Sequence, residues 1–301
     1  MSFWVYNNNK LKMETKIIDG REIRKKILED IKNEISLLPF QPVFCDVLVG
    51  DDSVSRQYVE MKAKTAEKVG IKFHRAEFNE DVTSQSLSEE IQKLGNVLNM
   101  CGIIVQLPLP LRFFDDKRKI LDSVPEELDV DCLGSKASEK FYRNENEIGF
   151  PTALACMTML DSLNMELKGK NIVVIGQGEL VGRPVTTLLK FRRLEPVTVR
   201  SNTENKDEII KNADIIISGI GKGKFITGDM IKEGVVVIDA GTSESNDSKN
   251  DYSIKKEIVG DVDFDSVNGI ASYVSKVPGG VGPVTVAMLL NNVLKVAKRK
   301  L

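Results

Sequence analysis

Two patterns of apolar positions alternate along the chain, one typical of helices and the other of buried strands. Isoleucines recur every four positions from Ile23 to Ile35, which predicts a helix over residues 20–38 that ends before Pro39. Helical spacing also predicts helices at 55–69, 87–98, 117–123, 151–164, 180–191, 207–213 and 284–300. Short apolar runs predict strands at 43–49, 71–78, 102–106, 171–175, 197–200, 214–218 and 235–239. Strands that alternate with helices indicate an α/β fold with mostly parallel sheets.

The length of 301 residues favours two domains. A hydrophobic content of 42% and a formal net charge of −2 exclude a wholly disordered chain and give no reason to expect a nucleic-acid partner. No apolar run reaches the roughly 18 residues of a membrane span, and the first ten residues lack the apolar segment of a secretory signal. We therefore expect a cytoplasmic protein without a membrane partner, with an organelle left open. Residues 1–14 are expected to be a flexible extension, and residues 243–256 a polar loop.

Histidine and cysteine usage excludes several kinds of site. His74 is the only histidine, so one chain cannot supply two or three histidine ligands to a metal. A Ser-His-Asp triad would have to use His74 itself. The four cysteines form no Cys-x-x-Cys pair, which argues against a zinc ribbon and favours reduced intracellular thiols. No metal is expected.

A glycine-rich turn follows the apolar strand at 171–175. Gly176 permits a tight turn, Gly178 lets the backbone approach a pyrophosphate, and Gly182 allows close packing of the next helix. The start of that helix presents backbone N–H groups to a phosphate. The pattern predicts a dinucleotide-binding turn, and a purely structural strand-to-helix turn is the alternative.

The next strand bears on the choice of cofactor. An NAD site normally carries an acidic residue near the end of this strand, where it binds the ribose 2′-hydroxyl. Here the strand ends at Arg200 and Ser201, which can bind a 2′-phosphate instead. NADP is therefore favoured over NAD, and a solvated surface arginine is the alternative for Arg200.

Polar residues that can take part in catalysis or ligand binding lie in the first half of the chain. Tyr58 and Lys62 are four residues apart and share one face of a predicted helix. A buried lysine can transfer protons near neutral pH, although the pair alone is more typical of packing plus a solvated charge. Gln106 ends an apolar strand at the edge of the sheet where ligands bind in α/β folds. Asp129 and Asp131 lie in a turn, without further metal ligands nearby.

Together these segments resemble the methylenetetrahydrofolate dehydrogenase/methenyltetrahydrofolate cyclohydrolase family. The resemblance extends from about Lys16 to the final helix and keeps the order and spacing of its blocks. The blocks are LVGD at 48–51 with YVEMK at 58–62, GIIVQLPLP at 102–110, DVD at 129–131, VGRP at 181–184, VGDV at 259–262 and PGGVGP at 278–283.

The resemblance implies two α/β domains with a cleft between them. It implies a catalytic, folate-binding domain at 15–155, joined by the C-terminal helix at 285–301, and a Rossmann-type NAD(P)-binding domain at 156–284. It also implies a homodimer.

The resemblance assigns roles to individual residues. Lys62 matches the family's catalytic lysine, Tyr58 the tyrosine beside it, and Gln106 the glutamine that supports the lysine. Asp131 matches the aspartate that binds the pterin ring. The residues expected to border the folate are Tyr58, Pro278, Gly279 and Gly280. The residues expected to bind the cofactor are Gly176, Gln177, Gly178, Gly182, Arg183, Arg200, Ser201, Gly282 and Thr285.

The implied chemistry has two steps. Methylenetetrahydrofolate is oxidised to methenyltetrahydrofolate with NADP, or with NAD, and the product is hydrolysed to 10-formyltetrahydrofolate. A dehydrogenase for another small substrate and a non-catalytic folate- or nucleotide-binding homologue are the alternatives. The sequence departs from the family at Cys132, where glycine is usual, at residues 150–153, and at Gln177, where many NADP-using members have arginine.

Overall fold

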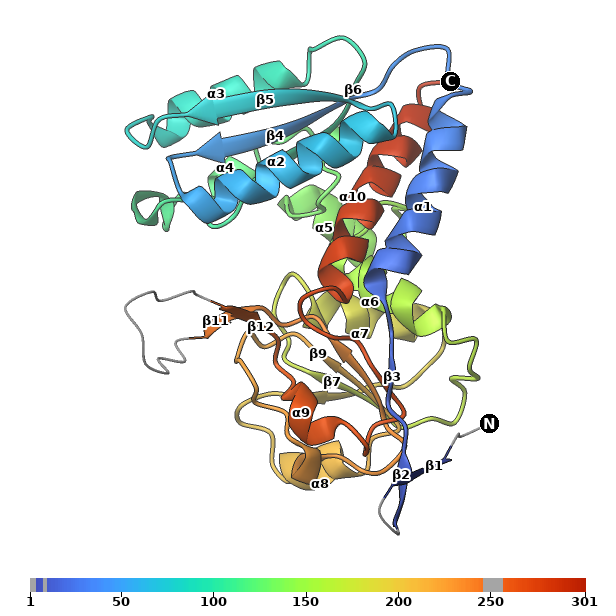
Figure 1. The fold of residues 1–301 in the computed structure, drawn as a ribbon. Coiled ribbons are helices and arrows are strands. Elements are labelled where there is room, and N and C mark those ends of the chain that lie inside the picture. The colour runs from blue at the N-terminus through green and yellow to red at the C-terminus, as the bar shows by residue number, and fades with distance from the viewer. Residues whose placement is uncertain (1–3, 8–9, 246–256) are drawn as a thin grey trace, which may run out of the picture. The chain divides into compact units, whose positions relative to one another are not determined.

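The chain forms two compact units in the computed structural model, which describes residues 4–7, 10–245 and 257–301 (Figure 1). Unit 1 comprises the chain up to residue 24 together with residues 152–285, and unit 2 comprises residues 25–151 and 286–301. Two helices, α1 (Gly20–Ile35) and α10 (Val281–Lys298), begin in unit 1 and end in unit 2. The expected boundaries place residues 15–24 in the N-terminal domain, whereas these residues belong to unit 1 because β3 (Lys16–Ile17) joins its sheet.

Unit 2 is built around three parallel strands in the order β5–β4–β6. These are β4 (Val43–Val49), β5 (Lys72–Phe78) and β6 (Met100–Val105). All positions of β4 and β6 are buried, which explains why both strands are almost entirely apolar. The chain places β5 on one side of β4 and β6 on the other, so the topology switches at the carboxyl end of β4, where α/β sheets bind ligands.

Four helices of unit 2 follow these strands. They are α2 (Ser53–Lys68), α3 (Ser84–Leu94), α4 (Lys117–Leu121) and α5 (Ser135–Tyr142), with short 3₁₀ helices at Leu111–Phe113 and Glu126–Leu128. α2 lies beside the sheet (Figure 1) and begins after Asp52, whose carboxylate accepts a hydrogen bond of 2.7 Å from the N–H of Ser55. The apolar spacing predicts α2, α3 and α4 but not α5.

Unit 1 contains a six-stranded parallel sheet in the order β3–β13–β10–β9–β7–β8. Besides β3, its strands are β7 (Ile172–Ile175), β8 (Val197–Val199), β9 (Ile215–Ser218), β10 (Val236–Asp239) and β13 (Tyr273–Val274). The helices are α6 (Pro151–Asp161), α7 (Gly182–Phe191), α8 (Lys206–Lys211) and α9 (Phe264–Val267), with a 3₁₀ helix at Gly228–Met230. The expected α/β fold with parallel sheets is confirmed.

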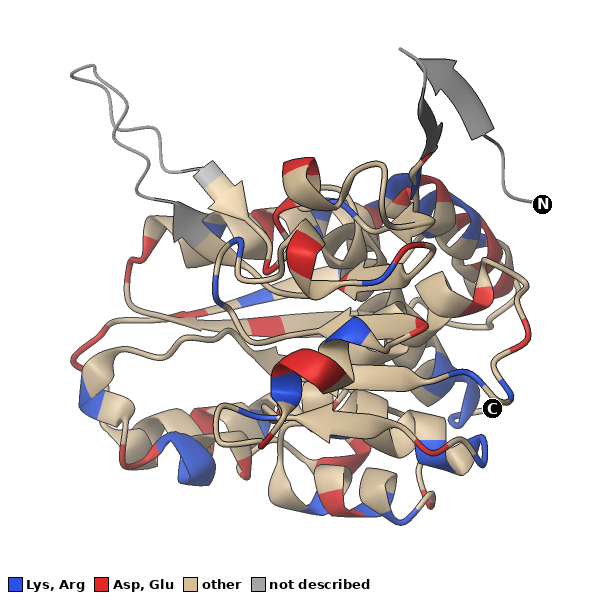
Figure 2. Cartoon of the chain, turned by 90° about the horizontal axis from the view of Figure 1, so that it is seen from below, with Lys and Arg blue, Asp and Glu red and all other residues tan. Residues whose placement is uncertain are grey.

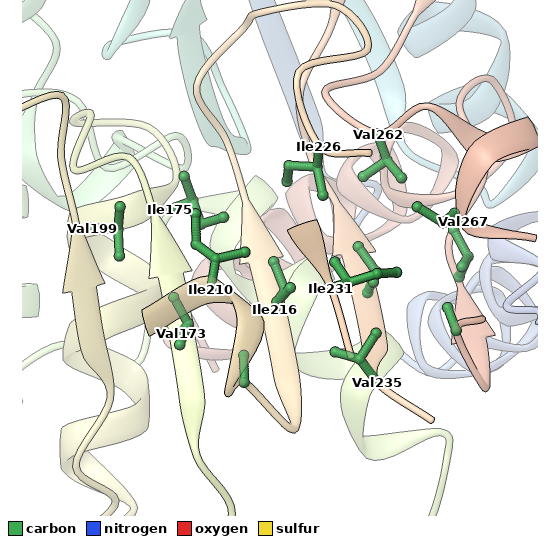
Figure 3. Packing of buried hydrophobic residues seen from close by; sticks show 14 residues of the cluster. Val173, Ile175, Val199, Ile210, Ile216, Ile226, Ile231, Val235, Val262 and Val267 are labelled. Atoms are coloured by element: carbon green, nitrogen blue, oxygen red, sulfur yellow. The ribbon is translucent and has the colours of Figure 1, made fainter. Parts of the chain in front are cut away.

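One face of the unit 1 sheet packs into an apolar core. Val173 and Ile175 of β7 and Ile216 of β9 lie with Ile210 of α8 in this core (Figure 3). Each of these side chains is buried, and every position of β7 and β9 is buried, so the core fixes which of two covered faces packs toward α8.

Two antiparallel strand pairs lie outside the main sheets. In the expected N-terminal extension, β1 (Trp4–Asn7) pairs with β2 (Lys10–Met13), while residues 1–3 and 8–9 lie outside the described residues. In and after the expected polar loop, β11 (Ser243–Ser245) pairs with β12 (Glu257–Val259), and residues 246–256 lie outside the described residues.

Charged residues of both signs are interspersed along the described elements (Figure 2). No helix in the described ranges is long and apolar enough to cross a membrane. Among the same residues, no group of three or more histidine, cysteine, aspartate or glutamate side chains could hold a metal ion.

Candidate active site

Lys62 is the centre of a buried polar cluster in unit 2. It lies on α2, and only 8% of the residue is exposed. Its Nζ donates a hydrogen bond of 2.6 Å to Oε1 of Gln106, which directly follows β6. The backbone N–H of Gln106 donates to the carbonyl oxygen of Val47 at 2.9 Å, so the sheet itself fixes the position of this amide. The structure thus brings together a lysine and a glutamine that are 44 residues apart in the sequence.

Asp46 is a member of this cluster that sequence reasoning missed. It lies in the middle of β4, and its Oδ2 is 2.6 Å from Nζ of Lys62. Burial raises the pKa of the Asp46 carboxyl above its usual value, and the charge of Lys62 opposes this shift. The available signal was a single acidic residue inside the apolar run VFCDVLV.

Tyr58 lies one turn before Lys62 on α2 and is 41% exposed, which leaves its phenol accessible to a ligand. The two side chains therefore share a helix face, as their spacing predicts. The ring of Tyr58 is at the surface of unit 2, whereas the lysine points into it.

The turn that carries Asp129 and Asp131 runs beside β6, where Asp129 bridges to Ile103. The Asp129 carboxylate accepts hydrogen bonds from the N–H groups of Leu133 at 3.4 Å and Gly134 at 2.7 Å, so this residue shapes the turn. Burial and the neighbouring Asp129 carboxylate raise the pKa of Asp131 to about 7, while the charge of Lys62 lowers it. Asp131 is thus close enough to Lys62 for the two charges to interact.

Cys132 follows these aspartates and has a φ of +60°. This left-handed conformation is readily adopted by glycine, the residue that the family resemblance leads us to expect there. The turn therefore keeps a glycine-like backbone although its side chain is a buried thiol.

The glycine-rich turn of unit 1 follows β7, between the neighbouring strands β8 and β9. Gly176 has a φ of +88°, and a Cβ atom at Gly182 would lie 2.0 Å from the carbonyl oxygen of Gly176. A Cβ atom at Gly178, by contrast, would meet no atom within 4 Å, and Gly178 is exposed. The turn therefore presents open, accessible backbone at the start of α7, which fits a pyrophosphate group.

The side chains around this turn differ in how they are held. Nε2 of Gln177 donates to the carbonyl oxygen of Gly176 at 2.7 Å and to the hydroxyl of Thr186 at 3.1 Å, so this side chain folds back on the turn. The N–H of Gly176 donates to the carbonyl oxygen of Val199 at 2.8 Å. Arg200 and Ser201 directly follow Val199, the last residue of β8, so both leave the sheet beside the turn. Both residues are exposed, as is Arg183 on α7.

The loop after β13 also belongs to unit 1. The N–H of Gly20 donates to the carbonyl oxygen of Gly279 at 3.0 Å, and a Cβ atom at Gly280 would lie 2.8 Å from the carbonyl oxygen of Lys276. The loop is therefore closely packed at Gly280, whereas Pro278 and Gly282 are exposed. The hydroxyl of Thr285 donates to the carbonyl oxygen of Val281 at 3.1 Å within α10.

Comparison with known protein families accounts for most of the chain. Residues 18–131 match the catalytic domain of tetrahydrofolate dehydrogenase/cyclohydrolase, and residues 151–301 match the NAD(P)-binding domain of the same family. A curated relative, the bifunctional protein FolD of Staphylococcus aureus strain MRSA252, is 35% identical over 291 residues, covering 96% of this chain and 98% of the relative.

Two solved structures are similar over nearly their whole length. The methylenetetrahydrofolate dehydrogenase-cyclohydrolase of Trypanosoma brucei, complexed with NADP and an inhibitor, is 35% identical with a TM-score of 0.88, covering 95% of this chain and 98% of the other. The FolD enzyme of Campylobacter jejuni is 34% identical with a TM-score of 0.87, covering 95% and 100%. With both domain matches in sequence order and the buried lysine in the first of them, this chain belongs to the tetrahydrofolate dehydrogenase/cyclohydrolase family.

Proposed function

We propose that this protein is a bifunctional enzyme of one-carbon metabolism. It oxidises 5,10-methylenetetrahydrofolate to 5,10-methenyltetrahydrofolate with NADP, and it hydrolyses the methenyl product to 10-formyltetrahydrofolate. The observation that supports this proposal best is the partly buried hydrogen bond between Lys62 and Gln106 in the catalytic domain, since a lysine held in this way can transfer protons in the domain that the family resemblance assigns to catalysis.

The glycine turn of unit 1 is suited to NADP. Gly176, Gly178 and Gly182 leave the backbone open at the start of α7, and Arg200 offers a guanidinium group for the 2′-phosphate. When bound, NADP supplies the acceptor for the hydride that leaves the methylene carbon. We assign the remaining contacts to Gln177, Arg183, Ser201, Gly282 and Thr285.

Lys62 serves the hydrolytic step. A water oxygen bonds to the methenyl carbon and loses a proton, which leaves a hydroxyl group on that carbon. The hydroxyl then loses its own proton to become the formyl C=O on N10, as the bond from the carbon to N5 breaks and N5 gains a proton. Lys62 transfers protons in these steps, while Gln106 fixes the position of its Nζ. The Asp131 carboxylate accepts hydrogen bonds from the N–H groups of the pterin ring, and the Tyr58 ring borders the substrate. The family resemblance also assigns folate contacts to Pro278, Gly279 and Gly280 of unit 1.

We also propose a homodimer in the cytoplasm. The dimer follows from the family resemblance, and four buried free cysteines are typical of an intracellular protein. Sedimentation equilibrium gives the oligomeric state, and fractionation of the source cells gives the compartment.

The first experiment supplies purified protein with methylenetetrahydrofolate and either NADP or NAD, and follows reduced nicotinamide and the methenyl product together. Turnover that prefers NADP is expected. A preference for NAD would contradict the role of Arg200, and folate binding without turnover would contradict an enzymatic function.

A variant tests the role of Lys62 directly. Lys62→Met should lower cyclohydrolase activity by roughly 10²- to 10⁴-fold, which is the usual contribution of general acid–base catalysis. Lys68→Met on the same helix is the matched control, because Lys68 is exposed. Unchanged hydrolysis by Lys62→Met would remove Lys62 from the mechanism.

A further inference from the structure

Asp46 is a fully buried carboxylate in the most apolar part of unit 2. Its side chain is 0% exposed, and every other residue of β4 is apolar. Within the described part of the chain, neither of its carboxylate oxygens has a conventional hydrogen-bond partner. Among the described residues, Asp46 forms an ion pair with Lys62 at 2.6 Å, and the lysine side chain is itself only 10% exposed.

Such an arrangement is costly for folding alone. Removing two charges from water is offset only by good geometry and further hydrogen bonds, and an apolar pair of similar volume would often be at least as stable. Asp46 lacks those further hydrogen bonds, while Lys62 donates to Gln106 as well. The pair is thus explained better by what it does for the lysine than by what it does for the fold.

The geometry around the Nζ atom is specific. Asp46 approaches from β4 and Gln106 from the end of β6, each at 2.6 Å, so adjacent strands fix the atom from two directions. The only negative charge among these two groups is that of Asp46, because Gln106 is neutral. Asp46 therefore balances the ammonium charge of Lys62, whereas Gln106 orients the ammonium group through a hydrogen bond without balancing its charge.

We propose that Asp46 is a positioning residue of the cyclohydrolase reaction, which holds the Lys62 ammonium against Gln106 and balances its charge. This inference rests on the proposed function, since it acts through the lysine assigned to proton transfer.

Other groups near Lys62 also carry charge or titrate. Asp131 and its neighbour Asp129 come from the turn beside β6, Tyr58 comes from α2 itself, and Cys45 precedes Asp46 on β4. Burial and the Asp46 charge raise the pKa of Cys45, so its thiol stays protonated across the working range. The Asp131 carboxylate also interacts through its charge with both Lys62 and Asp46.

The test compares cyclohydrolase pH profiles, measured with methenyltetrahydrofolate and without NADP. Asp46→Asn keeps the size of the side chain and removes its charge. We expect kcat to fall at least about tenfold while KM stays within about threefold, because the lysine is displaced and the substrate contacts are not. The alkaline limb of the pH profile should move toward acid in Asp46→Asn, because a carboxylate 2.6 Å from Nζ favours the protonated lysine.

Asp46→Glu retains the carboxylate and should keep the alkaline limb of the pH profile at its wild-type position, although the extra methylene group lowers thermal stability. Asp46→Glu also provides the test if Asp46→Asn does not fold. A shift of the alkaline limb of the pH profile in Asp46→Glu would overturn the proposal. Cys45→Ala is the control for damage to β4: it should lower stability without moving the profile. In the Lys62→Met background, Asp46→Asn should cause no further loss of hydrolysis, as expected for two residues that act through one group.

The outcomes separate this inference from the proposed function. If the wild-type protein shows no cyclohydrolase activity, the proposed function fails. If the wild type is active and Asp46→Asn loses only thermal stability while keeping its profile, Asp46 is structural and the inference is overturned. An unchanged kcat in Asp46→Asn has the same consequence.

Discussion

Replacing Gly178 by alanine should weaken the use of NADP without weakening the fold. A Cβ atom at this position would contact no atom within 4 Å, and the backbone there is not left-handed. We therefore expect a change in the free energy of unfolding of less than about 1 kcal/mol, and a small gain in stability is the usual result at such sites. The methyl group instead fills the space through which a pyrophosphate would approach the turn.

The size of the effect follows from this crowding. Forcing an extra methyl group into a close contact costs about 1–3 kcal/mol. Each 1.4 kcal/mol changes an equilibrium constant about tenfold, so the KM for NADP should rise about 5- to 150-fold. The assay measures dehydrogenase turnover at increasing NADP, thermal unfolding, and cyclohydrolase activity in the absence of NADP. The last two should be unchanged.

Gly182→Ala is the matched comparison. Its Cβ atom would lie 2.0 Å from the carbonyl oxygen of Gly176 and 3.0 Å from Cα of Gln177, so the backbone of the turn has to move. This variant should lose thermal stability together with NADP use. If Gly178→Ala keeps the wild-type KM for NADP, or if both variants unfold alike, the turn does not hold the pyrophosphate as argued.

Two further predictions concern the ligands. The pKa of Asp131 is raised to about 7, and its ionised form makes the stronger hydrogen bonds to the N–H groups of a pterin, so the Kd for tetrahydrofolate should rise by up to about tenfold between pH 8 and pH 6. The same raised pKa means that the free energy of unfolding falls as the pH rises from about 4 to about 7, because the folded state holds a proton there that the unfolded state has released; denaturant titrations of the wild type and Asp131→Asn should therefore differ most at and above pH 7. Equal folate affinity at both pH values would exclude Asp131 from the pterin site. Arg200→Ala should raise the KM for NADP about 10- to 150-fold, because a charge-assisted hydrogen bond to the 2′-phosphate is lost. The KM for NAD should not change. An equal rise in the KM for NADP and for NAD would show that Arg200 is a non-specific surface charge.

The sequence alone predicts the elements whose burial is complete. Strands such as β4 and β7 are apolar at nearly every position because both faces are covered, so each appears as a continuous apolar run, broken in β4 only by Asp46. The helix α2 is predicted by its spacing, and the glycine turn by its place between a strand and a helix. These features are local, since a few neighbouring residues suffice to specify them.

Elements that depend on distant partners escape such a prediction. The two-residue strands β3 and β13 exist because Lys16 and Ile17 pair with Tyr273 and Val274, more than 250 residues away. The short helix α5 (Ser135–Tyr142) buries only Ala137 and Phe141, so its apolar spacing extends over too few residues to predict a helix from the sequence. A sequence pattern carries little information on pairings of this kind.

The candidate site shows the same division. Residue types and spacing are enough to select Lys62, Tyr58 and Gln106 as candidates, once the family resemblance is recognised. Only the tertiary structure shows Asp46 against Lys62, because β4 and α2 have to pack before a carboxylate in an apolar strand acquires a partner. Likewise, the left-handed backbone at Cys132 is set by the turn around it and not by the preference of its side chain. The sequence thus determines which groups are available, and packing decides which of them meet.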